Sequence, residues 1–372
     1  MVTILNCKTK AELKLFERTP EAIHSNEPYF VPPFPGSIVK FFSPKSPAQK
    51  HGKLFPMLAY REGKVVGRIA AVVNRNHNEY YKDKVGFFGF FDFIDDVEVA
   101  RALYEKAKEV IRAEGLSEIR GPYSPTVNDE CGLLVEGFES IPFVSMPFNP
   151  AYYEKIYLQL GLTKARDLYA YYLSSAGGTP EKVLRVLDRV KKKSGITLRS
   201  IEMKRLDEEL KVIQELYNDT LKRNWGFVPI SYEDLQYAAD DLKQVVDPEM
   251  VMVAEKDGVP IGFCMFIPNV NEFMWKAKKH KNTLARILKF AWLMKTSKPK
   301  EIRLAVLGMK PEYQNTGIAA LFYSESFVRG QHKWVGGELS WIEESNEPMM
   351  KSIGIFGAKR YKNYRIFEQA LD

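Results

Sequence analysis

The sequence lacks the features that mark several classes of protein. It has no run of about 18 apolar residues, so we expect no transmembrane helix. The motifs HExxH and GxSxG and the Walker phosphate-binding loop are all missing. Three widely spaced cysteines (Cys7, Cys131, Cys264) and five scattered histidines form neither a disulfide framework nor a zinc cluster. We therefore expect no bound metal, no serine acyl-enzyme and no use of ATP.

Composition and charge fit a folded, soluble protein of 372 residues. Hydrophobic residues make up 45% of the chain and charged residues 27%, which excludes disorder and a coiled-coil rod. The first residues, MVTILNCKTK, contain no apolar signal core, so we expect a cytoplasmic location. A net charge of +7 favours an anionic partner without identifying it.

Short segments recur at a nearly constant offset, in the same order. AELKLF at 11–16 resembles EELKVI at 208–213, and Phe-Val-Pro at 30–32 returns at 227–229. The series continues with the segments 59–67 and 254–262, and with Asn149-Pro150 and Asn346, which has Pro348 close by. It ends with Gly-x-x-Lys at 161 and Gly-x-Lys at 357. We interpret the chain as two copies of one domain, 1–173 and 180–372, joined by a linker at 174–179.

Each copy shows the same predicted order of elements. A short β-branched strand and an amphipathic helix precede a hairpin, whose turn contains Glu62-Gly63 in the first copy and Asp257-Gly258 in the second. An apolar strand then runs into a helix (87–93 into 97–113; 302–309 into 317–329), and a further strand, helix and strand follow. This order predicts an α/β protein with a mixed, mostly antiparallel sheet flanked by helices in each copy.

The strand at 302–309 leads into the loop Lys-Pro-Glu-Tyr-Gln-Asn-Thr-Gly at 310–317 and then a helix. Gly317 permits close approach of another group to the backbone where the helix begins. The unpaired N–H groups of a first helical turn, at the positive end of the helix dipole, suit a phosphate or pyrophosphate. A plain strand-to-helix turn with glycine at its corner explains the same pattern.

Gln314-x-x-Gly317-x-Ala319 and the preceding Met309-Lys-Pro-Glu-Tyr run resemble the signature of the GCN5-related N-acetyltransferase superfamily. The resemblance implies a tandem acyltransferase that uses acetyl-CoA or a longer acyl-CoA. It also implies that the loop amides bind the pyrophosphate, that the pantetheine arm pairs beside the motif strand, and that the Met309 N–H binds the thioester oxygen. The implied cofactor-binding residues are Leu307, Met309, Gln314, Asn315, Thr316, Gly317, Ile318, Ala319 and Asn346, although Asn346 also suits a helix cap.

The first copy departs from this signature. Its corresponding turn, Asp-Phe-Ile-Asp-Asp-Val-Glu at 92–98, has no glycine and carries several carboxylates. Acidic side chains suit a helix N-terminus but repel a pyrophosphate. We expect the first copy to have lost cofactor binding.

Acyl transfer to an amine requires a base, and three glutamates near predicted strand ends are candidates: Glu272, Glu343 and Glu344. Each also suits a solvated surface. The resemblance implies a tyrosine seven residues after Asn346, but Ile353 stands there. The loop after the first helix of the second copy contains Arg223, Trp225 and Phe227, which are candidates for the acceptor site or for core packing.

The segment 273–300 carries nine lysines or arginines and no acidic residue, and positions 284, 287, 288, 291 and 292 share one helical face. Such a segment suits an anionic membrane, the phosphates of a cofactor, or a surface helix with its basic face in water.

We therefore expect an N-acyltransferase that transfers an acetyl group to a small amine. The alternatives are a long-chain acyltransferase that forms an amide lipid, similar to bacterial ceramide synthesis, at the inner face of the membrane, and a non-catalytic acyl-CoA-binding module. Without a recognisable nucleic-acid-binding motif we do not expect nucleic-acid binding, and the oligomeric state is open.

Overall fold

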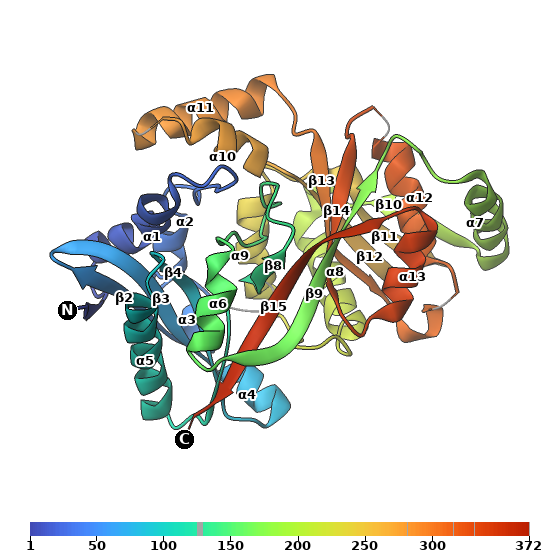
Figure 1. Cartoon of the computed structure of the whole chain (residues 1–372). Helices are drawn as coiled ribbons and strands as arrows, with labels where there is room; N and C mark the ends of the chain where they lie inside the picture. The colour runs from blue at the N-terminus through green and yellow to red at the C-terminus, as the bar shows by residue number, and fades with distance from the viewer. Residues whose placement is uncertain (125–128, 281, 315, 331, 372) are drawn as a thin grey trace. The chain divides into compact units, whose positions relative to one another are not determined.

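The computed structural model describes residues 1–124, 129–280, 282–314, 316–330 and 332–371. The chain forms two compact units (Figure 1). Unit 1 comprises residues 1–168, 271–296 and 362–372, and unit 2 comprises residues 169–270 and 297–361. Two segments of the predicted second copy thus contribute to unit 1. The compact units do not follow the predicted repeat boundaries segment by segment, and those boundaries stay a prediction.

Unit 1 is a mixed sheet between helices. Its elements are β1 (Thr3–Asn6), α1 (Lys10–His24), α2 (Ser37–Phe41), α3 (Ala48–His51), β2 (Gly52–Arg61), β3 (Lys64–Asn74), α4 (Arg75–Tyr81), β4 (Val85–Phe93), α5 (Val97–Ala113), β5 (Glu118–Gly121), β6 (Tyr123–Ser124), β7 (Glu130–Cys131), β8 (Leu133–Glu136), α6 (Tyr152–Gln159), α10 (Asn271–Ala277), α11 (Thr283–Thr296), the start of β9 (Thr163–Ser174) and the end of β15 (Lys359–Ala370). The sheet order is β1-β2-β3-β4-β5-β15, and β8 pairs with β15.

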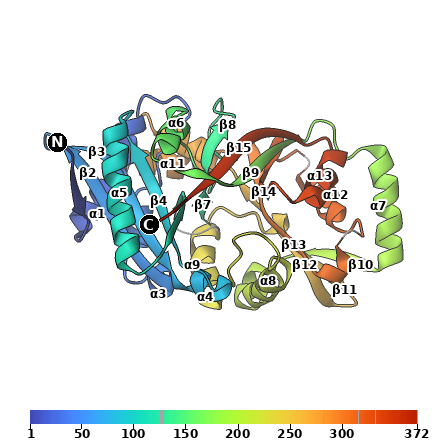
Figure 2. The same cartoon turned by 60° about the horizontal axis from the view of Figure 1, so that its bottom comes forward.

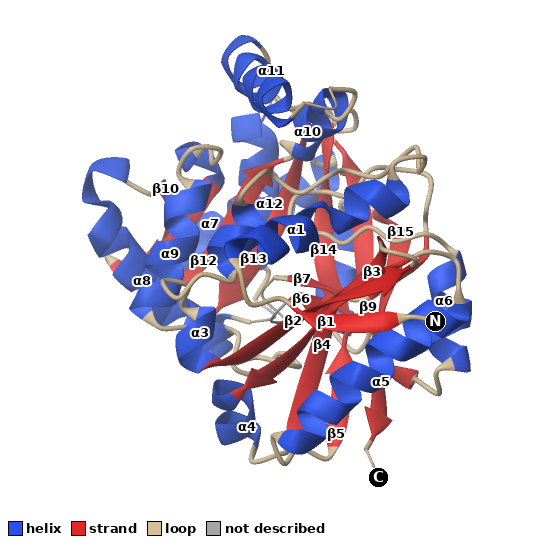
Figure 3. Cartoon of the chain, turned by 90° about the vertical axis from the view of Figure 1, so that its left-hand side faces the viewer, coloured by secondary structure: helices blue, strands red, loops and turns tan. Residues whose placement is uncertain are grey.

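Alternating side chains of the unit 1 strands form two separate cores. Met57 and Ala59 of β2 lie in the larger core with α5, whereas Leu58 between them packs toward Phe16 of α1. Figure 3 accordingly shows the strands of unit 1 between α1 and α5.

Unit 2 has the same plan. Its elements are α7 (Glu181–Ser194), β10 (Ile196–Ser200), α8 (Leu206–Thr220), α9 (Tyr232–Leu242), β11 (Val251–Lys256), β12 (Val259–Pro268), β13 (Glu301–Met309), α12 (Ala319–Gly330), β14 (Gly336–Glu343), α13 (Glu347–Ile355), the end of β9, the start of β15, and short 3-10 helices at Met203–Arg205, Pro248–Met250 and Pro311–Tyr313. The sheet order is β9-β14-β13-β12-β11-β10. Met252 and Ala254 pack with α12 and α13, and Val251 and Val253 pack with α8. Helix α7 lies beside α12 (Figures 1 and 2).

The two hairpin predictions are confirmed. Strands β2 and β3, and strands β11 and β12, pair antiparallel across tight turns. Glu62 and Gly63 have φ of 50° and 75°, and Asp257 and Gly258 have φ of 51° and 78°. Two successive positive φ angles match the twist of the flanking strands, which is why Gly is favoured at the second position.

The basic segment 273–300 does not form one continuous amphipathic helix. It forms two helices, α10 and α11, that belong to unit 1. The indole N–H of Trp275 donates to the Pro28 carbonyl at 2.8 Å, and the Lys278 ammonium donates to the carbonyls of Glu27, Pro28 and Phe30 at 3.2, 2.9 and 3.0 Å. These bonds attach α10 to the loop that follows α1.

Candidate active site

The predicted cofactor loop connects β13 to α12 and exposes its backbone. Gly317 has a φ of +82°, and among the described residues a β-carbon there would meet only Val190 of α7, at 3.8 Å. The backbone conformation, rather than lack of space, therefore requires glycine at this position. Ile318 is buried in the core, whereas Gln314, Thr316 and Gly317 are exposed. Thr316 and Gly317, which precede Ala319 at the start of α12, are thus exposed to solvent at the positive end of a helix.

Two side chains hold the loop in this shape. The Gln314 amide donates to the Met309 carbonyl at 3.0 Å, and the Thr316 hydroxyl donates to the Tyr313 carbonyl at 2.6 Å. Gln314 therefore closes the turn through its side chain. Asn315, which was also predicted to bind the cofactor, lies outside the described residues.

Strands β13 and β14 part along their length. Their parallel register runs from Glu301 opposite Gly336 to Leu304 opposite Leu339, although β13 continues to Met309 and β14 to Glu343. A bulge in the pairing of β13 with β12 falls at the same point, after Leu304. The second half of β13 thus keeps β12 as its neighbour and diverges from β14.

The backbone of Met309 is directed toward the β14 side of β13. Lys310 N–H donates to the Ile261 carbonyl of β12 at 2.9 Å. Because successive residues of a strand direct their N–H and C=O groups to opposite neighbours, those of Met309 and Leu307 point away from β12. The Met309 carbonyl already accepts from the Gln314 amide, so an extended ligand segment beside β13 would find its partners at the Met309 N–H and at the backbone of Leu307.

A buried polar cluster lies where β13 and β14 begin to part, and the sequence analysis missed it. The Glu338 carboxylate, fully buried, accepts hydrogen bonds from the hydroxyls of Ser340 and Tyr361. Arg303, opposite Glu338 on β13, donates from Nε to the Ser340 hydroxyl at 2.8 Å. Polar residues at alternating positions of an apolar strand, 338 and 340, are the only signal for this cluster in the sequence.

The three predicted bases are divided between the two units. Glu343 ends β14 and is buried, accepting a hydrogen bond from the Ser345 hydroxyl, and Glu344 follows it in a half-buried position. Glu272 lies on α10 in unit 1. Only Glu343 and Glu344 therefore share a unit with the loop that begins after β13.

Two of the remaining predicted positions take structural roles in unit 2. The Asn346 side chain accepts from the Met349 N–H at 3.2 Å and caps α13, and Ile353 of this helix is fully buried in the core. Phe227 is buried against Tyr217, with ring centroids 5.8 Å apart. Trp225 is half-buried and Arg223 is exposed. These positions favour the capping role of Asn346 and the packing role of Phe227.

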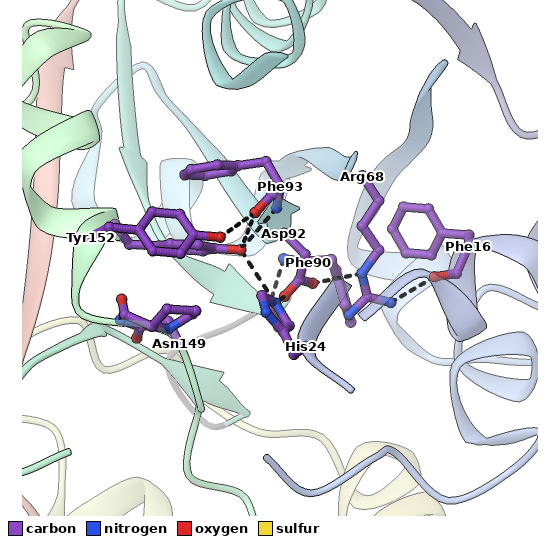
Figure 4. A network of polar contacts seen from close by, with 11 residues as sticks. Phe16, His24, Arg68, Phe90, Asp92, Phe93, Asn149 and Tyr152 are labelled. Atoms are coloured by element: carbon purple, nitrogen blue, oxygen red, sulfur yellow. Dashed lines mark hydrogen bonds and ion pairs between the residues drawn. The ribbon is translucent and has the colours of Figure 1, made fainter. Parts of the chain in front are cut away.

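The first unit contains the same backbone position, but side chains of its own bind there. Ile94 N–H donates to the Val66 carbonyl, so Phe93 corresponds to Met309. The Phe93 N–H donates to the Tyr153 hydroxyl at 2.8 Å, and its carbonyl accepts from the Tyr152 hydroxyl at 2.8 Å (Figure 4). The backbone N–H that corresponds to that of Met309 is thus already bonded at Phe93.

The helix that follows β4 is capped by a carboxylate. Asp96 accepts from the N–H groups of Glu98 and Val99 at 2.8 and 3.3 Å, at the start of α5. The hydrogen bond from Arg61 and those two N–H groups lower the pKa of the Asp96 carboxyl, so it is an anion at neutral pH. A negative charge of the protein itself therefore lies where an anion would bind the helix.

Next to Phe93, a buried network surrounds Asp92 (Figure 4). Its carboxylate accepts from Arg68 Nε at 2.7 Å and lies 3.0 Å from Nε2 of His24, which in turn lies 3.3 Å from the Tyr153 hydroxyl. Burial alone would raise the pKa of Asp92, but the charge of Arg68 and the contact with His24 lower it to about 2. The His24 and Asp92 pair has the chemistry of an oriented base, enclosed by the core of unit 1.

Among the described residues, no group of three or more His, Cys, Asp or Glu side chains is arranged to hold a metal ion. No family model matches the chain.

The chain is similar to two curated proteins over nearly its whole length. It is 33% identical to Protein YghO of Escherichia coli (strain K12), over 99% of this chain and 95% of that protein. It is 32% identical to a bacterial ceramide synthase of Caulobacter vibrioides, over 100% of this chain and 98% of that protein. A solved tandem GNAT protein from the clavulanic acid biosynthesis pathway matches with a TM-score of 0.59 and 14% identity, covering 100% of this chain and 98% of that one. The chain thus has the tandem fold of the GCN5-related N-acetyltransferase superfamily and belongs, within it, to the family that includes Protein YghO and bacterial ceramide synthase.

Proposed function

We propose that the protein is an acyl-CoA-dependent N-acyltransferase that forms an amide lipid, transferring a long-chain acyl group to the amine of a lipid. The proposal rests on the exposed loop between β13 and α12. Beside this loop, the backbone groups of Met309 and Leu307 point to the side where β13 is no longer paired with β14. The ceramide synthase at 32% identity favours the long-chain alternative over acetyl transfer, since a ceramide is a long-chain amide of an amino alcohol.

The residues around the loop fit an acyl-CoA. Gly317 permits the turn, Ile318 is buried, and Thr316 and Gly317 are exposed to solvent at the positive end of α12, where a pyrophosphate binds. Leu307 and Met309 pair with the extended pantetheine arm, and the Met309 N–H stabilises the negative charge that develops on the thioester oxygen.

In the proposed reaction the amine attacks the thioester carbonyl directly. A C–N bond forms, the C–S bond breaks, the amine transfers a proton to a base, and the departing thiolate takes up a proton. We propose Glu343 as the base, because it lies buried at the end of β14 beyond the point where the two strands part. Glu338 is a positioning residue, since the hydroxyls of Ser340 and Tyr361 and the side chain of Arg303 already surround it.

Glu344 provides a matched control for this assignment. Glu343→Gln should lower kcat by at least about 100-fold while leaving the Kd for acyl-CoA within a factor of about two. Glu344→Gln, one residue further along, should retain nearly full kcat. Equal losses in the two variants, or none in Glu343→Gln, would contradict the role of Glu343 and return Glu272 to consideration.

The first unit has a different role in this proposal. Because Tyr152 and Tyr153 bind the backbone of Phe93 and Asp96 caps α5, unit 1 binds no acyl-CoA and serves as a scaffold. One chain therefore uses one acyl-CoA at a time. We place the protein in the cytoplasm, at the inner face of the membrane that holds its lipid acceptor.

The direct test is product analysis by mass spectrometry. The purified chain is incubated with palmitoyl-CoA and a long-chain amino alcohol, and in parallel with acetyl-CoA and small amines. We expect the long-chain amide, with kcat/KM at least about tenfold above that for any acetyl product, which corresponds to about 1.4 kcal/mol. Acetyl products alone would support the small-amine alternative. Binding of acyl-CoA without any product would support the non-catalytic module.

A further inference from the structure

Helix α11 is docked on unit 1 by a side that carries Arg286, Phe290 and Leu293. Arg286, almost fully buried, forms a two-pronged ion pair with Glu21 of α1, in which Nη1 lies 3.0 Å from the carboxylate. Phe290 packs edge-on against Phe34, and Leu293 is buried on the same side. Figures 1 and 3 show α11 at the margin of unit 1, beyond α1 and α10.

The opposite side of α11 exposes three large apolar side chains in a row. Leu284, Leu288 and Trp292 are 64%, 61% and 54% exposed, and their spacing of four residues aligns them along one face of the helix. These three residues are called the α11 stripe below. An amphipathic helix that covers its apolar face with the rest of the protein would show the reverse arrangement. The three exposed side chains of the α11 stripe therefore do not serve to stabilise unit 1, and their exposure needs another explanation.

Only basic groups flank the α11 stripe within its own segment. Residues 273–300 contain nine lysines or arginines and no aspartate or glutamate. The Lys289 ammonium lies 3.8 Å from the centre of the Trp292 ring, and the side chains of Lys279, Lys295 and Lys298 are exposed. An apolar stripe bordered by cations matches the interface of an anionic bilayer, where the apolar side chains enter the acyl region and the cations contact phosphates.

We propose that the α11 stripe docks the protein on the surface of an anionic lipid bilayer. Among the described residues no helix is long and apolar enough to cross a membrane, so the contact is with the surface only. The inference rests on the proposed function to the extent that a lipid acceptor gives the docking its purpose. It extends that function by stating where the enzyme meets the membrane that supplies the acceptor.

Co-sedimentation with vesicles tests the surface without any substrate. The full chain is mixed with vesicles of phosphatidylcholine alone, or of phosphatidylcholine with phosphatidylglycerol, at low and high salt. We expect binding to the anionic vesicles that weakens by about fivefold for each lysine contact screened by salt. Replacing the stripe (L284Q, L288Q and W292Q together) should weaken partitioning by about 100-fold, because three half-exposed apolar side chains no longer enter the bilayer.

A matched control carries three equal changes elsewhere. Leu158, Val328 and Ile355 are 58%, 64% and 62% exposed on α6, α12 and α13, and L158Q, V328Q and I355Q together should bind vesicles as the unmodified chain does. Equal loss in both triple variants, or no binding to anionic vesicles, would overturn the proposal. So would light scattering that shows a dimer which the stripe variant alone converts to a monomer, because a second copy would then cover the stripe.

The outcomes separate this inference from the proposed function. Vesicle binding that depends on the stripe, in a chain that forms no amide, would uphold the docking surface and refute the acyltransferase. Amide formation in detergent micelles, with no stripe-dependent vesicle binding, would uphold the acyltransferase and refute the docking surface.

Discussion

Asp92→Asn should destabilise unit 1 strongly, although the change is nearly isosteric. In the folded chain the Asp92 carboxylate is the counter-charge of Arg68, whose guanidinium is almost fully buried over the ring of Phe16 at 4.9 Å. The amide leaves this charge buried without a partner of opposite sign, which costs about 3–5 kcal/mol. Arg68 also donates to the Phe16 carbonyl at 2.9 Å, so it is held in place and cannot move into solvent.

Calorimetry of the full chain measures this cost. The midpoint temperature for unfolding of unit 1 should fall by roughly 10 °C in Asp92→Asn. The double variant Asp92→Asn with Arg68→Met removes the stranded charge and should recover most of the loss. A transition within about 2 °C of the unmodified chain would refute the reasoning. Full stability with loss of acyl transfer would instead assign the His24 and Asp92 pair to catalysis.

Three further predictions follow from the cited pKa shifts and contacts. Because the pKa of Asp92 is about 2 against an ordinary 3.8, its charge contributes about 2 kcal/mol to the free energy of unfolding above pH 4. This contribution is lost as the pH falls from about 4 to 2. If acid titration of unit 1 shows no loss of stability in this window beyond that of Asp92→Asn, the prediction is contradicted. Burial raises the pKa of the Cys264 thiol, and burial together with the charge of Glu12 raises the pKa of Cys7 to about 12. Iodoacetamide at neutral pH should therefore modify both cysteines in the unfolded chain and neither in the folded chain, which mass spectrometry would show. Calorimetric titration with palmitoyl-CoA should give one site per chain, and one site also in Asp96→Ala, because Tyr152 and Tyr153 still occupy the Phe93 backbone. A second site in the unmodified chain would contradict the role given to unit 1.

Local patterns predicted much of the fold and of the cofactor loop. The turns at Asp257-Gly258 and Glu62-Gly63 and the helix that ends the Gln314–Ala319 motif depend on residues adjacent in sequence, and each forms as expected. These features have local physical causes, namely positive φ angles and exposed helix N–H groups.

Other features depend on contacts between residues far apart in the sequence, and local patterns indicate them only weakly. Glu338 is buried beside Arg303 and Tyr361 because β13, β14 and β15 bring the three together. The orientation of α11 follows from Glu21, which pairs with Arg286 from 265 residues away, so amphipathic spacing alone left open which face of the helix contacts the protein. Periodicity shows that a helix has two faces but not which one a neighbour will cover.

The account depends most on acyl-CoA binding at the loop between β13 and α12. The most direct measurement is the Kd for palmitoyl-CoA of the unmodified chain, of Gly317→Glu, and of Gly258→Glu. Both glycines lie in unit 2 and have positive φ angles, +82° and +78°, so the two variants carry the same added charge and a similar backbone cost. Gly258, however, lies in a hairpin turn, where no atom of the described residues lies within 4 Å of its β-carbon position. We expect Gly317→Glu to weaken binding at least about 100-fold, about 2.7 kcal/mol, and Gly258→Glu to leave it unchanged. Equal affinity in all three proteins would contradict the placement of acyl-CoA on this loop.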